Sequence, residues 1–309
     1  MRKTSAVRLP AGMGMLYPVA LAAVVGLAAC SDQSTSPTPA IDNPDQAIEF
    51  EVTPDGAAEA RDATMRGMHK LPTIPLRERI TVAFDNSPLD MTYFGGQVVT
   101  HATNYAVAVN CVTPNTPATC WGNGTLSPKD FLQALNLSNY LRLANEYIGV
   151  DAKENFPARE MKTRMTFTAN EASLQDILQI VADASTKTGA SGYGAIYHIF
   201  LPQGTGMCIE EGNCYSPNDL DSWTFCAFHG SVNLSSGRHV LFTVQPYQGV
   251  DGCSIPGQTP NGLIDATAST LTHEIFETIT DPDLDGWSNV LFGFEVADPC
   301  LAFGSNRTM

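Results

Sequence analysis

Basic residues are scarce in this chain of 309 residues, in which 17 Lys and Arg stand against 32 Asp and Glu and the formal net charge is −15. Proteins hold nucleic acids and anionic lipids largely through lysine and arginine, so the charge argues against a nucleic-acid partner. Cysteine is also limited: eight residues are too few for a miniprotein held together by disulfides alone. Because 43% of the residues are hydrophobic and 16% are charged, the chain can bury the core of one large domain or two small ones.

The N-terminus has the pattern of an export signal. Three basic residues within the first eight positions precede an apolar run over 13–29, which ends in Leu-Ala-Ala followed by Cys30. This ending resembles the bacterial lipobox, whose cysteine carries a lipid and becomes the first mature residue. We therefore expect a lipoprotein signal peptide over 1–29 and a lipid on Cys30 that anchors the protein in the bacterial cell envelope, facing the periplasm or the exterior. The alternative is a transmembrane anchor, although about 17 residues are at the short edge of a span.

The next part of the chain predicts a tether. Residues 31–47 are polar and rich in Pro, Ser and Thr, a composition that buries too little apolar surface to become ordered. The following residues show no clear periodicity. We expect a flexible tether over 30–79 and a folded domain over 80–309.

Strand and helix signals are mixed within this domain. Alternating or apolar runs predict strands over 97–111, 161–168, 195–201 and 238–244. Capping patterns that begin at Ser127 and Ser173 predict helices to about 147 and 184, and a third helix is predicted over 265–280. The order indicates an α+β fold, or an αβα arrangement of layers, with a zincin-like mixed sheet and long loops tied by disulfides.

The third predicted helix carries the sequence His273-Glu274-x-x-Glu277. Positions four apart share one face of a helix, so His273 and Glu277 can bind one metal ion while Glu274 reaches a metal-bound water. This is the zincin pattern His-Glu-x-x-His with its second histidine replaced by glutamate. The bare pattern also occurs on ordinary amphipathic helices, whose charged face is simply solvated.

Residues outside this helix favour a metal site. Zinc sites commonly take two ligands from one short spacing and a third from a distant element, and Glu295 is our first choice for that third ligand. Asp298 is either a carboxylate that supports the ligands or the alternative ligand. His229 is either a ligand, a group that stabilises an oxyanion during catalysis, or a histidine that is merely hydrogen-bonded at the end of a strand.

These motifs resemble the phosphate-induced protein family, also called EXORDIUM-like. The segment 91–100 is similar to the family's Tyr-His-Gly-Gly-Pro-Val opening, and its later motifs His-Glu-x-x-Glu, Asn/Asp-Pro, Ala/Gly-Trp and Glu-Ile-Ala/Gly-Asp-x-Cys are similar to 271–282, 286–287 and 295–300. The resemblance covers about 80–300. It implies a secreted, wall-associated protein whose bacterial relatives resemble zinc-dependent hydrolases. Phe94 stands where the family usually has histidine, which removes one candidate site residue.

The segment after the helix is more acidic than in plant members of this family. Asp281, Asp283 and Asp285 precede Gly286, which matches the opening of an EF-hand loop. The twelfth position is Phe292 instead of glutamate, so a standard EF-hand is excluded. A different Ca²⁺-stabilised loop and a solvated acidic turn are the two remaining interpretations.

The residues together predict a lipid-anchored, zinc-dependent hydrolase, with a peptide or cell-wall substrate by analogy with zincins. Metal-bound water would attack a carbonyl group while Glu274 accepts its proton. One imidazole and two carboxylates cancel the charge of a divalent ion, so Glu274 would carry more of the activation than in a site with three histidines. The alternative is a non-catalytic surface protein that binds a wall component or a signalling partner and whose metal is structural.

Cysteine spacing predicts the disulfides. With Cys30 assigned to the lipid, seven cysteines remain in an oxidising compartment. The pairs that lie near each other in sequence are Cys111 with Cys120, Cys208 with Cys214, and Cys226 with Cys253. Cys300 is left over, which leads us to expect a chain truncated at its C-terminus.

Overall fold

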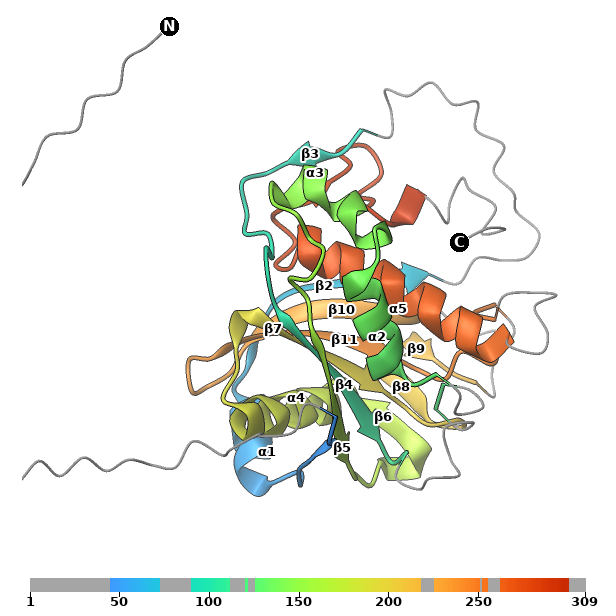
Figure 1. Cartoon of the computed structure of the whole chain (residues 1–309). Helices are drawn as coiled ribbons and strands as arrows, with labels where there is room; N and C mark the ends of the chain where they lie inside the picture. Colours follow the sequence, from blue (N-terminus) through green and yellow to red (C-terminus); the bar gives the residue numbers. More distant parts are fainter. Residues whose placement is uncertain are drawn as a thin grey trace, which may run out of the picture. The chain divides into compact units, whose positions relative to one another are not determined.

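A seven-stranded mixed sheet is the centre of the fold in the computed structural model (Figure 1). The strand order is β1-β5-β4-β7-β11-β10-β2. The first five strands are parallel, whereas β10 runs antiparallel to both β11 and β2. In this order their bounds are Ile48–Glu49, Ala158–Thr163, Thr103–Val109, Gly192–Phe200, His239–Gln245, Phe225–Asn233 and Thr64–Pro72.

The structure describes most of the predicted domain. The described residues are 45–72, 90–111, 120–121, 126–217, 225–250, 252–254 and 262–299. All of them fall within the unit Ile41–Met309. The predicted signal peptide, Cys30, the first part of the predicted tether and Cys300 lie outside the described residues, so lipid anchoring stays a prediction.

Helices cover both faces of the sheet (Figure 1). One face carries α1 (Pro54–Arg61) and α4 (Leu174–Thr188), and the other carries α2 (Pro128–Leu137), α3 (Asn145–Ile148) and α5 (Gly262–Thr280). Smaller elements are a 3-10 helix over Tyr140–Ala144, another over Thr168–Asn170, and the short strands β3 (Thr92–Tyr93), β6 (Glu171–Ser173), β8 (Gly206–Glu210), β9 (Asn213–Tyr215) and β12 (Trp287–Ser288). The fold is thus mixed α+β, as predicted.

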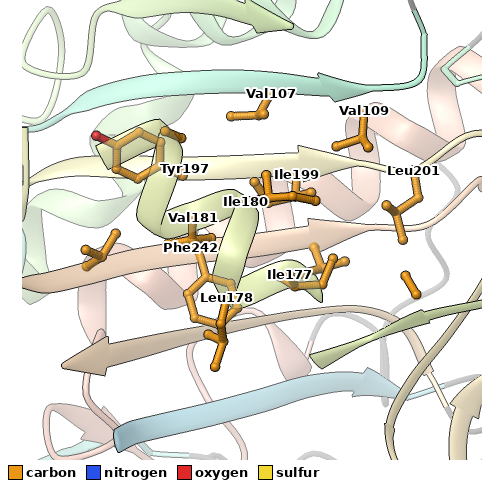
Figure 2. Packing of buried hydrophobic residues seen from close by; sticks show 14 of the residues in the cluster. Val107, Val109, Ile177, Leu178, Ile180, Val181, Tyr197, Ile199, Leu201 and Phe242 are labelled. Carbon is orange, nitrogen blue, oxygen red and sulfur yellow. The ribbon is translucent and has the colours of Figure 1, made fainter. Parts of the chain in front are cut away.

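Side chains that alternate along the central strands pack into two hydrophobic cores, one on each face of the sheet. Val107 and Ile199 face α4, whereas Ala106 and Phe200 face α2 and α5. Figure 2 shows the first core, in which Ile177, Leu178, Ile180 and Val181 of α4 lie against Val107, Val109, Tyr197, Ile199, Leu201 and Phe242. Burial on both faces explains why these strands are apolar runs in the sequence.

Capping boxes fix the starts of two helices where they were predicted. Ser127 begins α2 and Ser173 begins α4, and each serine exchanges hydrogen bonds with the aspartate three residues later. The first predicted helix is too long, because Ser138 is extended, with ψ 157°, and ends α2 at Leu137. The strand predicted over 97–111 is too long as well: the backbone N–H of Val99 donates to the carbonyl of Ile279 in α5, and β4 begins only at Thr103.

The folded region begins well before the predicted boundary at residue 80. In the stretch assigned to the tether, β1 pairs with β5 and β2 pairs with β10. Thr53, which caps α1, donates a hydrogen bond of 2.6 Å from its hydroxyl to Asp183 of α4. The tether prediction for 45–72 is therefore corrected: these residues order by pairing with distant strands, which no local pattern reveals.

Three disulfides confirm the predicted pairs: Cys111–Cys120, Cys208–Cys214 and Cys226–Cys253. The second joins β8 to β9, and the third ties the start of β10 to the segment after β11. Such a set is typical of an extracytoplasmic protein. Within the described ranges, none of the helices has the length and apolar character needed to cross a bilayer.

Candidate metal centre

Two histidines on neighbouring strands form one wall of the centre. His69 of β2 lies directly opposite His229 of β10, and their ring centroids are 5.9 Å apart. The His229 side chain is fully buried, whereas that of His69 is 23% exposed. The imidazole of His69 is therefore the part of the centre nearest to solvent.

Helix α5 supplies the second wall, with three neighbouring side chains near its C-terminal end. His273 Nε2 lies 2.9 Å from Glu277 Oε1, one turn further along the helix. Glu274 is fully buried, and its Oε2 lies 3.3 Å from His229 Nδ1. The helix thus presents Glu274 and Glu277 to the histidine on β10, with Glu277 Oε2 3.6 Å from His229 Nδ1.

The segment after α5 completes the centre. The carboxylate of Asp298 accepts a hydrogen bond of 2.9 Å from the backbone N–H of Glu295, which folds this segment back on itself. Glu295 Oε2 then lies 2.7 Å from His69 Nδ1, and Asp298 Oδ1 lies 3.6 Å from His273 Nε2. Asp298 Oδ2 also lies 3.5 Å from His69 Nε2, so both carboxylates approach His69 and Asp298 approaches His273 as well.

The possible ligand atoms form two groups with one shared member, Glu277. The first group is His69, His229, Glu277 and Glu295, and the second is His273, Glu277 and Asp298. Within each group the atoms lie within 4.8 Å of one another. Two donors bound to one Zn²⁺ at tetrahedral angles are about 3.3 Å apart. The separations of 3.4 Å and 3.6 Å from Glu277 Oε2 to His69 Nδ1 and His229 Nδ1 are close to that value.

Unsatisfied polar atoms show how well this cluster fits a cation. The buried side-chain atoms that lack a well-aligned hydrogen bond in the described structure include His229 Nε2, His273 Nε2, Glu274 Oε1, Glu277 Oε1 and both carboxylate oxygens of Glu295. Two of these carboxylate oxygens, Glu277 Oε1 and Glu295 Oε2, face an imidazole nitrogen at 2.9 Å and 2.7 Å. A buried polar atom without a partner costs free energy. A divalent cation would satisfy several of these atoms at once, so the residues fit such an ion.

Burial and neighbouring charges divide the carboxylates and imidazoles into different protonation states. Burial raises the pKa of Glu274, whereas for Glu277 the charge of His273 and hydrogen bonds from the histidines outweigh burial and hold the pKa well below its usual range. For His69, burial lowers the pKa, but the adjacent carboxylates of Glu277 and Glu295 raise it to about 12. A metal ion would replace these protons, because it binds neutral imidazole and ionised carboxylate.

All six residues predicted from the sequence come together here: Glu274, His229, His273, Glu277, Glu295 and Asp298. Asp298, the alternative third ligand, is grouped with His273, while Glu295 is grouped with the strand histidines. The prediction missed His69. Its strand contains Gly67, ends at Pro72 and has few β-branched residues, so the local strand signal is weak.

The predicted calcium loop is not supported, since its three aspartates serve different partners. Asp281 accepts a hydrogen bond of 2.6 Å from the backbone N–H of Gly286. Asp283 accepts hydrogen bonds from Ser231, Tyr193 and His239. The side chain of Asp285 is on the exposed side of the turn. Among the residues placed by the structure, no metal-binding group includes these three carboxylates.

Comparisons with known proteins found no relative of this chain. It matches no protein-family model, no curated protein and no solved structure. The resemblance to the phosphate-induced protein family therefore stays a prediction from the motifs.

Proposed function

We propose that this protein is an extracytoplasmic, lipid-anchored metal-dependent hydrolase, with a zinc peptidase as the specific form. The observation that carries the proposal is the convergence of histidine and carboxylate ligand atoms, most of them buried and without a well-aligned hydrogen bond, around Glu277, with Glu274 beside them. The His-Glu-x-x-Glu sequence on α5 supports a zincin-like use of the site.

The candidate ligands are the histidines and carboxylates of the two groups that share Glu277. Mixed imidazole and carboxylate donors suit Zn²⁺, and their oxygen-rich character also suits Mn²⁺. A bound divalent ion supplies Lewis acidity, which polarises a carbonyl group and makes water a better nucleophile. The substrate would be a peptide or a cell-wall component, by analogy with zincins.

Glu274 is the general base in this proposal. Burial raises its pKa, which brings the carboxylate closer to the range in which it can both accept and return a proton at neutral pH. One of its oxygens lies 3.3 Å from Nδ1 of His229, a candidate ligand, and the other has no hydrogen-bond partner among the described residues. Glu274 thus lies beside the candidate ligands with one carboxylate oxygen free to accept a proton.

The route of a substrate is indicated by His69. Its strand β2 is the last in the strand order and pairs with β10 alone among the described strands. An extended peptide can add to such an edge through backbone hydrogen bonds. The exposed side of His69 would then meet the peptide, which supports a peptide as the substrate class.

The test combines metal analysis with one substitution. The full chain, purified without chelator, should contain stoichiometric metal and cleave members of a peptide library. Glu274→Gln should retain the metal and lose about 10²–10⁴-fold in turnover, the usual contribution of a general base. Glu146→Gln, at an exposed glutamate of α3, is the matched control and should behave like the wild type. Unchanged turnover in Glu274→Gln would refute the mechanism.

A non-catalytic surface protein with a structural metal is the second candidate function. It is favoured by one observation: Glu274 and Glu277 are fully buried, as ligands are in closed structural sites. A structural ion contributes directly to folding. Removal of the metal should then unfold the protein, whereas a hydrolase should stay folded and regain activity when the metal is returned.

A further inference from the structure

We propose that the centre holds two divalent cations bridged by the carboxylate of Glu277. The inference rests on metal binding by the proposed hydrolase and deepens the description of that site. Glu277 Oε2 lies 3.4 Å from His69 Nδ1 and 3.6 Å from His229 Nδ1. Glu277 Oε1 lies 2.9 Å from His273 Nε2. The two oxygens of one carboxylate thus face separate sets of imidazoles.

A second carboxylate lies between the same two sets. Asp298 Oδ2 is 3.5 Å from His69 Nε2, while Asp298 Oδ1 is 3.6 Å from His273 Nε2. A carboxylate in this position contacts both imidazoles, one with each oxygen. His69 faces Glu277 with Nδ1 and Asp298 with the opposite nitrogen, so Asp298 can accept a hydrogen bond that orients His69, while Glu277 is the ligand that the two groups share.

The number of donors exceeds what one ion takes. Six side chains offer ligand atoms, whereas a zinc site has four ligands at most in its common tetrahedral form. The group of His69, His229, Glu277 and Glu295 supplies four ligands, which is a closed set. The group of His273, Glu277 and Asp298 supplies three, which leaves one position open. The first ion would have all four positions filled by the protein, and the second would keep one position for water or substrate.

Buried charge also favours cation binding. Glu274, Glu277, Asp281, Glu295 and Asp298 are all buried, and none of them forms an ion pair with Lys or Arg in the part of the chain that the structure places. Uncompensated buried charge is strongly unfavourable, so protons on these groups and on the neighbouring imidazoles, or bound cations in their place, must neutralise the carboxylates.

The arrangement of donors resembles that of hydrolytic sites with two metal ions. Hydrolytic sites with two metal ions hold them about 3.5–4 Å apart, a spacing that one bridging carboxylate spans. The mixed imidazole and carboxylate donors suit Zn²⁺, Mn²⁺ or Co²⁺. The inference is therefore a pair of first-row divalent ions held by six side chains from β2, β10, α5 and the segment after it.

The test is the number of ions bound per chain. The full chain is stripped with a chelator and titrated with Co²⁺, with absorbance and elemental analysis as readouts. The wild type should bind two ions in two steps. His273→Ala should lose one ion and keep the other, because His273 belongs only to the open group. His101→Ala, at an exposed histidine outside both groups, should still bind two.

A spectroscopic measurement covers the case in which His273→Ala fails to fold. Two Mn²⁺ ions about 3.5–4 Å apart couple magnetically, so the wild type loaded with Mn²⁺ should give a coupled electron paramagnetic resonance spectrum. A spectrum of isolated ions, or one ion per chain at saturation, would overturn the inference. One ion together with hydrolysis that depends on Glu274 would leave the proposed function standing. Two ions without hydrolysis would support the pair and refute the enzyme.

Discussion

His69 on β2 and His229 on β10 occupy directly opposed positions of two antiparallel strands, with ring centroids 5.9 Å apart. Opposed residues of an antiparallel pair point to the same face of the sheet, so both imidazoles face α5. A shift of one residue in this pairing would turn His69 to the other face. The register of β2 against β10 thus decides whether the metal centre is complete.

Substitution of His69 tests this role. His69→Ala should weaken metal binding more than about 100-fold, since loss of even a residue that only supports a ligand commonly costs 10–100-fold. The measurement is calorimetric titration of the metal-free chain with Zn²⁺. Lys70→Ala is the control, because the next residue in a strand points to the opposite face. Equal affinities of the two variants would exclude His69 as a ligand.

His198 should make the stability of the fold depend on pH. It is fully buried on β7, lies between Asn104 and Thr243 at hydrogen-bond distances of 3.0 Å and 2.9 Å, and burial lowers its pKa from 6.5 to about 3. Between these values the unfolded chain binds a proton that the folded chain does not bind. The free energy of unfolding should therefore fall as the pH drops below about 6.5, by up to about 1.4 kcal/mol per pH unit.

Comparison with a variant isolates this effect from that of the acidic residues. His198→Gln keeps a donor and an acceptor but has no group that titrates. Urea denaturation between about pH 5 and pH 7 should show a steeper loss of stability in the wild type than in the variant. Parallel curves would mean that His198 is protonated in the folded protein.

Asp283 should act as an anchor for the turn after α5. Burial tends to raise its pKa, but hydrogen bonds from His239, Ser231 and Tyr193 outweigh burial and hold the pKa below its usual range. Asp283→Ala should lower the free energy of unfolding by about 3 kcal/mol, because three donors lose a charged acceptor. Asp285→Ala, on the exposed side of the same turn, should change it by less than about 0.5 kcal/mol.

Calcium provides a separate check on this turn. Since the aspartates serve protein partners, millimolar Ca²⁺ should leave the Tm of the wild type unchanged in differential scanning calorimetry. An increase in Tm that disappears in Asp283→Ala would restore the calcium interpretation.

The disulfides should differ in their contribution to stability. Cys226–Cys253 closes a separation of 27 residues and Cys208–Cys214 one of 6. The chain-entropy relation gives about 3.5 kcal/mol for the first and about 2 kcal/mol for the second. Paired alanine substitutions followed by urea denaturation measure both values. A larger loss from the short loop would show that packing, and not loop closure, dominates.

Local signals made part of this structure predictable. The capping boxes at Ser127 and Ser173 and the His-Glu-x-x-Glu pattern act within four residues, and all three disulfides join cysteines at most 27 positions apart. Such features depend little on the rest of the fold. The same short range explains why His273, Glu274 and Glu277 could be named from the sequence. His229, Glu295 and Asp298 lie outside this motif and were named because histidine and carboxylates are the residue types that bind zinc.

Long-range pairing could not be predicted. The strand β2 has a weak local pattern and pairs with β10, and its candidate ligand His69 falls in the predicted tether. The predicted boundaries of some strands and helices were wrong for a related reason. Val99 continues an alternating pattern, yet its N–H bonds to the end of α5 instead of a neighbouring strand. In each case a distant partner determines the structure.

The distance along the chain between the ligands has a consequence for when the centre can form. His69 and Glu277 are separated by 208 positions, and Glu295 and Asp298 come later still. A preformed metal site rarely exists in an unfolded chain. With the proposed ligands, an ion would be captured after the segment that follows α5 has been made and has met β2. The metal bound would then be one available in the compartment where folding is completed.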